Sequence, residues 1–261
     1  MKKYMQGKMR TDLYQELYEV ENTHWWHKHK RATVHQMIKK YITNKGSVLD
    51  IGSGTGKILE ELKQYGWDVS GVDGASEAVV WSKKRGITTH QVDFVKNKLP
   101  FNNDSYDLVL ALDLLEHVPN DEQILQEMYR VLKPGGTAVI TVPAYQWLYN
   151  YWDEMLGHQR RYSMSELKKK IQKLDWQLTF ASYYFCLFLI PTVFVRKIKK
   201  LFNKTGDSDF KTTPFATITV PIMNMYAAFE RLLLRFIALP FGLSLIIVVR
   251  KPYNKVINQG L

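Results

Sequence analysis

The sequence of this 261-residue chain predicts an α/β fold with a doubly wound, mostly parallel sheet of seven strands. Two observations lead to this prediction. Apolar segments of strand character alternate with helix-like segments, as in a sheet with crossover helices. In addition, residues 48–56 read VLDIGSGTG, which is a short buried strand followed by a turn with three alternate glycines.

The expected elements run through the chain in a regular order. Strands are predicted at residues 48–51, 67–73, 87–92, 106–112, 137–142, 175–184 and 243–251. A helix follows the glycine turn from Lys57, and another runs from Asp121 to Leu132. The segment Lys133-Pro134-Gly135-Gly136 is predicted to stop that helix and turn into the fifth strand.

Four of these strands are followed by, or end in, an acidic residue: Asp50, Asp73, Asp93 and Asp113. Ligands of open α/β sheets bind beyond the carboxyl ends of the strands, so these acids are expected to share one site. Lys57 stands where a dinucleotide fingerprint requires its third glycine, which argues against a nicotinamide-dependent oxidoreductase. An acid beside the turn favours a ligand with a cationic or hydroxyl-rich part, and the position of Asp73 suits the hydroxyls of a ribose.

These motifs, with Leu115-Glu116-His117-Val118 and Leu132-Lys133-Pro134-Gly135-Gly136, resemble those of the class I S-adenosylmethionine-dependent methyltransferases, over roughly residues 46–143. The chain is most similar to the branch of the ubiquinone and menaquinone biosynthesis methyltransferases (methyltransferase type 11 like). The resemblance implies a Rossmann-like sheet, S-adenosylmethionine as cofactor and S-adenosylhomocysteine as product. The residues that it assigns to the cofactor are Asp50, Gly52, Ser53, Gly54, Gly56, Asp73, Gly74, Asp93, Phe94, Leu112 and Asp113.

Within this set the resemblance assigns separate roles. Gly52, Gly54 and Gly56 would pack against the methionine part, with the backbone of Leu112 and Asp113 beside it. Asp73 would hold the ribose, Asp93 the adenine amino group, and Phe94 would lie beside the adenine ring. Gly74 departs from the larger residue of many relatives, so no side-chain contact to the adenine is expected there.

Composition and charge add to this picture. The single cysteine, Cys186, excludes an internal disulfide and fits a reducing compartment, and the N-terminus lacks the apolar segment of a signal peptide. The net charge is +6 over residues 1–46, −5 over 47–135 and +10 over 136–261. The expected cofactor half is therefore acidic, whereas the flanks are basic and favour an anionic partner.

Residues 185–242 separate the last two expected strands. Gln177–Val195 carries no charge and is followed by the basic cluster Arg196-Lys197-Ile198-Lys199-Lys200, the pattern of a segment that lies at an anionic membrane surface. A cap or dimer interface and a spanning helix are the alternatives. Basic residues that flank apolar runs argue against nucleic acid as partner.

The sequence accordingly predicts three parts: an N-terminal helical lid (1–45), a cofactor-binding core (46–184 and 243–251) and an apolar, basic-flanked insertion (185–242). We expect a cytoplasmic protein, peripheral on the inner face of the cell membrane. The oligomeric state is left open.

Two clusters are predicted to contact a substrate: His24, Trp25 and Trp26 in the lid, and Arg160, Arg161 and Tyr162 after the fifth strand. His158, and as second choice His117, is the predicted general base. His24 and His27 lack the acidic partner of a metal site, so no metal is predicted.

The function predicted from the sequence is methyl transfer to an oxygen, nitrogen or carbon nucleophile of a lipidic or amphiphilic acceptor with an anionic head. A quinone precursor, a lipid-linked glycan and a glycolipid are examples. The alternative is a non-catalytic, membrane-associated binding module that retains the cofactor pocket.

Overall fold

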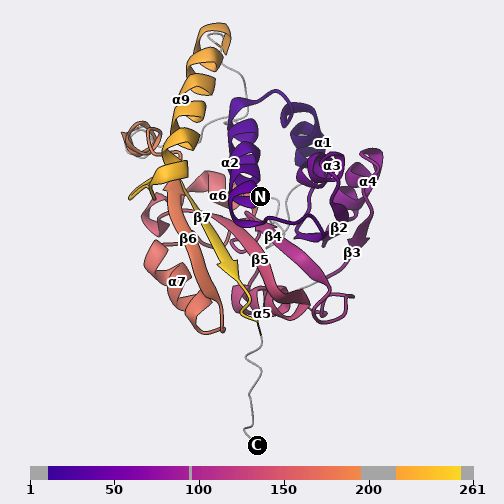
Figure 1. The fold of residues 1–261 in the computed structure, drawn as a ribbon. Helices are drawn as coiled ribbons and strands as arrows, with labels where there is room; N and C mark the ends of the chain where they lie inside the picture. Colours follow the sequence, from indigo (N-terminus) through magenta and orange to yellow (C-terminus); the bar gives the residue numbers. More distant parts are fainter. Residues whose placement is uncertain (1–10, 94–95, 195–215, 254–261) are drawn as a thin grey trace, which may run out of the picture.

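The computed structural model describes residues 11–93, 96–194 and 216–253, and its centre is a seven-stranded sheet (Figure 1). The strand order is β3-β2-β1-β4-β5-β7-β6, with β7 antiparallel to both of its neighbours. The strands are β1 (Ser47–Ile51), β2 (Asp68–Asp73), β3 (Thr89–Gln91), β4 (Tyr106–Leu112), β5 (Leu132–Pro143), β6 (Gln177–Tyr184) and β7 (Ser244–Arg250). The predicted doubly wound sheet is confirmed.

Helices cover both faces of this sheet, because side chains of buried strands point alternately to either side. On one face α5 (Asp121–Val131) and α7 (Met164–Gln172) pack against residues such as Val109 of β4. On the other face α2 (Trp25–Tyr41), α3 (Lys57–Gln64) and α9 (Ala216–Phe236) pack against residues such as Leu110. The described residues also form α1 (Thr11–Val20), α4 (Ser76–Lys84), α6 (Tyr151–Leu156) and the short 3-10 helix η1 (Gln146–Leu148).

The fifth strand begins earlier than the sequence suggested. Tyr106 of β4 pairs with Leu132, whereas Leu108, only two residues later, pairs with Thr137. The segment Lys133–Gly136 is therefore a bulge within β5, with Gly135 at a φ of +78°, rather than a turn before the strand. The predicted end of the helix is confirmed, since α5 ends at Val131, but the predicted turn is wrong, because glycine indicates a positive φ without distinguishing a turn from a bulge.

The segment between β6 and β7 contains α9, which lies beside α2 and extends beyond its end (Figure 1). Glu230 is buried on the side of α9 that faces α2 and the segment after β6, and it accepts four hydrogen bonds. The donors are His29 Nε2 at 2.6 Å, the backbone N–H groups of Phe185 at 2.9 Å and Cys186 at 2.7 Å, and the Tyr226 hydroxyl. Among the described residues no helix combines the length and apolar character that crossing a bilayer requires.

We expect Glu230→Ala to lower the free energy of unfolding by about 3 kcal/mol or more, because it leaves several buried donors without an acceptor. Urea denaturation followed by circular dichroism measures this change. Glu19→Ala, at an exposed position of α1, is the matched control. Equal stabilities of the two variants would show that Glu230 does not hold α9 in place.

Candidate functional site

A cavity of about 530 Å³ opens at the carboxyl ends of the parallel strands. Its walls come from the glycine turn after β1, the ends of β2 and β4, helices α1 and α2, and the α6 region. The predicted cofactor residues that line it are Asp50, Gly52, Ser53, Gly54, Asp73, Gly74, Asp93, Leu112 and Asp113. The tertiary structure thus brings together in one cavity the acids that follow four separate strands.

The glycine turn is joined to β2 through Asp73. One carboxylate oxygen of Asp73 accepts from the backbone N–H of Gly54 and the other from that of Ala75, both at 2.9 Å. Gly54 has a φ of +54°, and a β-carbon there would meet no atom within 4 Å. The turn therefore presents bare backbone to the cavity, as close approach of a ligand requires.

Asp50 is buried at the end of β1, and its Oδ1 has no hydrogen-bond partner among the described residues. Burial, with a smaller contribution from the nearby Asp73, raises the pKa of Asp50 to about 8. A buried carboxyl group with an unused oxygen at a cavity wall fits a ligand that brings hydrogen-bond donors or positive charge. S-adenosylmethionine has both, in its amino group and sulfonium.

The raised pKa of Asp50 has a consequence for stability. In the folded state Asp50 keeps its proton up to about pH 8, whereas in the unfolded chain it loses it near its ordinary value of 3.8. Folding therefore becomes less favourable as pH rises between these values, and Asp50→Asn should remove this loss. We expect the free energy of unfolding of the variant to rise relative to that of the wild type by up to ~1.4 kcal/mol per pH unit, until the pH reaches the folded-state pKa of about 8.

Urea denaturation across this pH range measures the difference between Asp50→Asn and the wild type. Asp68→Asn, at the exposed start of β2, is the control. A difference that does not grow with pH would contradict the assignment.

A lysine from α2 reaches the acid at the end of β4. Lys30 Nζ donates to Asp113 Oδ2, and the Thr141 hydroxyl donates to Asp113 Oδ1 at 2.7 Å. Lys30 lines the cavity with His27 and Arg31, three residues that share one face of α2. These three residues are not among those that the sequence predicts for the site, although their spacing of three and four residues in a helix indicates that they lie together.

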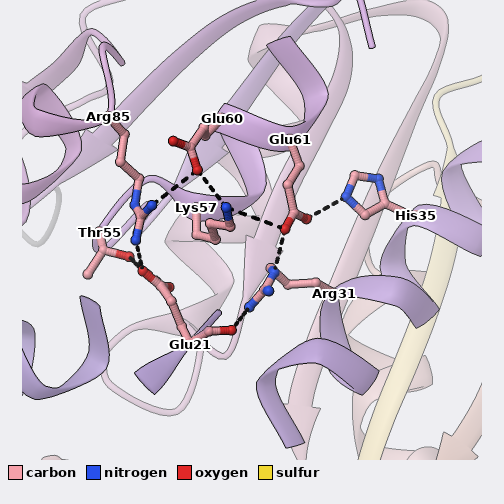
Figure 2. Close-up of polar contacts among 8 residues, drawn as sticks. All are labelled: Glu21, Arg31, His35, Thr55, Lys57, Glu60, Glu61 and Arg85. Carbon is pink, nitrogen blue, oxygen red and sulfur yellow. Dashed lines mark hydrogen bonds and ion pairs between the residues drawn. The ribbon is translucent and has the colours of Figure 1, made fainter. Parts of the chain in front are cut away.

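A polar network fastens the N-terminal helices beside the glycine turn (Figure 2). Glu21, between α1 and α2, accepts from the Thr55 hydroxyl at 2.7 Å and from Arg85 at 2.5 Å. Arg31 donates to Glu61 of α3 at 2.9 Å and to the Glu21 carbonyl at 2.7 Å. These contacts hold α1 and α2 against the cavity, where the sequence predicts a lid.

The predicted general bases both line the cavity, and their rings are in contact. His117 and His158 have ring centroids 4.7 Å apart at an angle of 82°. Burial, together with His158, lowers the pKa of His117 to about 3, so His117 is neutral at pH 7. His158 Nδ1 lies 2.9 Å from Asp153 Oδ1, so it donates to that carboxylate and its Nε2 is left as a proton acceptor.

Glu116 lies buried next to these histidines. Neither of its carboxylate oxygens has a hydrogen-bond partner among the described residues, and burial with the nearby Asp113 raises its pKa well above the ordinary value. Glu116, His117 and His158 each offer one ligand atom within 4.8 Å of the others, so this group has the composition and spacing to hold a cation. The sequence analysis considered only His24 and His27 as ligands, because His158 is remote from His117 in the chain.

The lid cluster predicted to bind substrate lies elsewhere. The Trp26 ring stacks on Phe185 at 3.6 Å, the Trp25 ring packs on Phe188 at 4.8 Å, and His24 is half-buried near His27. None of the three predicted residues lines the cavity. Trp25 and Trp26 begin α2 and pack on the segment after β6, and His24 is the residue before the helix, so the role seen for this cluster is packing.

The second predicted substrate cluster is largely internal as well. Arg161 is buried and bonds Asp153 at 2.7 Å, and the buried Tyr162 hydroxyl donates to Asp121 at 2.8 Å. Arg160 donates to the carbonyl of Pro119, a residue of the cavity wall, at 3.0 Å. Arg161 therefore acts on the site through Asp153, the partner of His158, and none of the three lines the cavity.

Two predicted cofactor residues are not part of the described cavity. A β-carbon on Gly56, at a φ of +76°, would meet Ser82 Cβ at 2.9 Å, so this glycine permits α3 and α4 to approach each other. Phe94 lies outside the described residues.

Several curated relatives match the chain over part of its length. The ubiquinone biosynthesis O-methyltransferase of Rickettsia prowazekii is 26% identical over 144 residues, 48% of this chain and 57% of that protein. The ubiquinone biosynthesis O-methyltransferase of Pectobacterium atrosepticum is 34% identical over a segment that makes up 34% of this chain and 39% of that protein. The sterol 24-C-methyltransferase of Saccharomyces cerevisiae is 34% identical and covers 39% and 27%. The matched segments thus span about half or less of these relatives.

Solved structures share the fold over most of the chain. The methyltransferase in complex with the Trm112 activator of Haloferax volcanii has a TM-score of 0.61 at 21% identity, with 94% of this chain and 96% of that chain covered. A methyltransferase of Thermotoga maritima has a TM-score of 0.56 at 18% identity, with 92% and 95% covered. A family model described as a methyltransferase domain matches residues 23–180, more than half of the chain. The chain belongs to this family of methyltransferase domains, and its fold is that of the class I S-adenosylmethionine-dependent methyltransferases.

Proposed function

We propose that the enzyme methylates a hydroxyl group of a lipidic or amphiphilic acceptor with an anionic head, at a membrane surface. The observation that carries the choice of a hydroxyl is the pair His158–Asp153, in which His158 lines the cavity and the buried Asp153 lies behind it. An oxygen acceptor must lose a proton when it is methylated, and a histidine oriented by a carboxylate suits that task.

The residues of the cavity divide the work of this reaction. Bound S-adenosylmethionine supplies an electrophilic methyl group on a sulfonium and leaves as S-adenosylhomocysteine. Asp73 and the glycine turn would hold it, and the same cavity wall carries the charged groups of Lys30 and Asp113. His158 Nε2 takes the proton from the acceptor oxygen, while Asp153 holds the ring and stabilises the imidazolium that forms.

Two features support an amphiphilic acceptor. The relatives include methyltransferases of ubiquinone biosynthesis and of sterols, whose names point to apolar products. The chain also carries net positive charge in its flanks, which favours an anionic head or an anionic surface.

Transfer of radiolabelled methyl groups from S-adenosylmethionine into bacterial lipid extracts tests this proposal. We expect label in one lipid-soluble product, formed in linear proportion to the enzyme. Mild methylation of the extract's free hydroxyls beforehand should abolish the labelling. Label that persists after this treatment would assign a nitrogen or carbon acceptor, and cofactor binding without any transfer would favour the alternative of a non-catalytic binding module.

A further inference from the structure

The outward side of α9 carries a stripe of exposed apolar side chains. They are Ile222, Met225, Phe229, Leu232 and Phe236. Their spacing of three and four residues places them on one face of the helix. Met225, Phe229 and Phe236 are exposed by 70%, 57% and 78%. Such a row of large apolar side chains marks a surface that binds another apolar surface.

Rotation of α9 that buries the stripe would break the contacts that hold the opposite side of the helix. The opposite side of α9 is held by Glu230, which bonds His29 of α2 and the backbone after β6, and by the buried Leu234. Gln36 and Lys40 of α2 add hydrogen bonds to the carbonyls of Arg231 and Arg235. The apolar face is therefore presented to the outside by an anchored helix.

Apolar residues of neighbouring segments make this surface wider than the helix. Leu187, Ile190 and Phe194 follow β6, and Phe241 follows α9; all four are exposed. These segments adjoin α9, because the Tyr226 hydroxyl accepts from the N–H of Leu187 and Cys186 bonds the carbonyl of Phe241. We call these four residues and the stripe the α9 surface.

We infer that the α9 surface docks on a bilayer that contains anionic lipid. Residues 185–242 carry eight basic and three acidic side chains, and one of the acids, Glu230, is buried. Arg235 is exposed beside Phe236. Six of the eight basic residues lie within residues 195–215, outside the described part of the chain, and are counted from the sequence alone. The net positive charge of the whole segment favours an anionic surface over a second copy of the same segment. The inference rests on the proposed function and names the partner surface that would bring the enzyme to its acceptor.

Sedimentation with vesicles of phosphatidylcholine, alone or mixed with phosphatidylglycerol, tests the inference. The full chain should bind the mixed vesicles more tightly than the neutral ones. The variant Met225→Ser/Phe229→Ser/Phe236→Ser should bind the mixed vesicles at least about tenfold more weakly, because it loses apolar contact with the acyl region. The control Tyr65→Ser/Val80→Ser removes side chains that are 60% and 55% exposed on other helices and should bind like the wild type.

Absence of binding to the mixed vesicles, or equal binding by the triple variant, would overturn the inference. Sedimentation velocity without lipid gives a second way to overturn the inference. If the wild type is a dimer and the triple variant is a monomer, the partner of the α9 surface is a second copy of the chain. Calorimetric binding of S-adenosylhomocysteine confirms that each variant is folded. Vesicle binding without methyl transfer would count against the proposed function and leave the docking surface intact.

Discussion

Asp73→Ala should weaken the binding of S-adenosylmethionine and S-adenosylhomocysteine by about a hundredfold or more, because each lost charged hydrogen bond is worth about 1.5–3 kcal/mol. The Asp73 carboxylate accepts from Gly54 and from Ala75, so it orders the glycine turn as well as facing the cavity. Its removal takes away the ligand contact and the shape of the turn together. Isothermal titration calorimetry measures both affinities.

The control for this prediction is Asp68→Ala, which removes an exposed carboxylate from the other end of the same strand. Its cofactor affinity should equal that of the wild type. The cofactor affinity of Asp73→Asn should lie between those of Asp73→Ala and Asp68→Ala, because the amide oxygen of the asparagine still accepts one of the two backbone hydrogen bonds. An unchanged affinity of Asp73→Ala would mean that the cofactor binds elsewhere than in the cavity described.

His158→Ala should lower the single-turnover rate of methyl transfer by about 10²–10⁴-fold, the usual contribution of a general base. Its cofactor affinity should stay within about twofold of the wild type, because the residue acts on the acceptor's proton rather than on the cofactor. Rapid-quench measurement with radiolabelled S-adenosylmethionine and the purified lipid acceptor gives the rate. His90→Ala, at an exposed position of β3, is the matched control.

Metal chelation separates the two chemical roles that the histidines can have. If His158 is a proton acceptor, dialysis against a chelator leaves the rate of methyl transfer unchanged. If Glu116, His117 and His158 hold a cation instead, chelation abolishes the activity and added Zn²⁺ or Mg²⁺ restores it. The second result would contradict the role of His158 as general base.

Local patterns in the sequence determined the sheet and the cofactor half of the site. Alternating apolar runs predict strands because each buried strand needs apolar residues on both faces, and the acids that follow these strands meet in one cavity because parallel strands end at the same edge. Gly54 and Asp73 could each be predicted from a short local pattern. Gly54 belongs to a glycine turn that needs a positive φ, and Asp73 is the carboxylate at the end of a strand.

The other half of the site depends on contacts between residues far apart in the chain. Lys30 and Asp113 are 83 residues apart in the sequence. Glu116 and His117 are separated from His158 in the chain by α5 and β5, and they lie together only in the folded structure. No periodicity encodes such pairs, because they depend on how whole helices pack. For the same reason the sequence showed that residues 185–242 are apolar and basic, but only the anchoring of Glu230 by α2 decided which side of α9 faces outward.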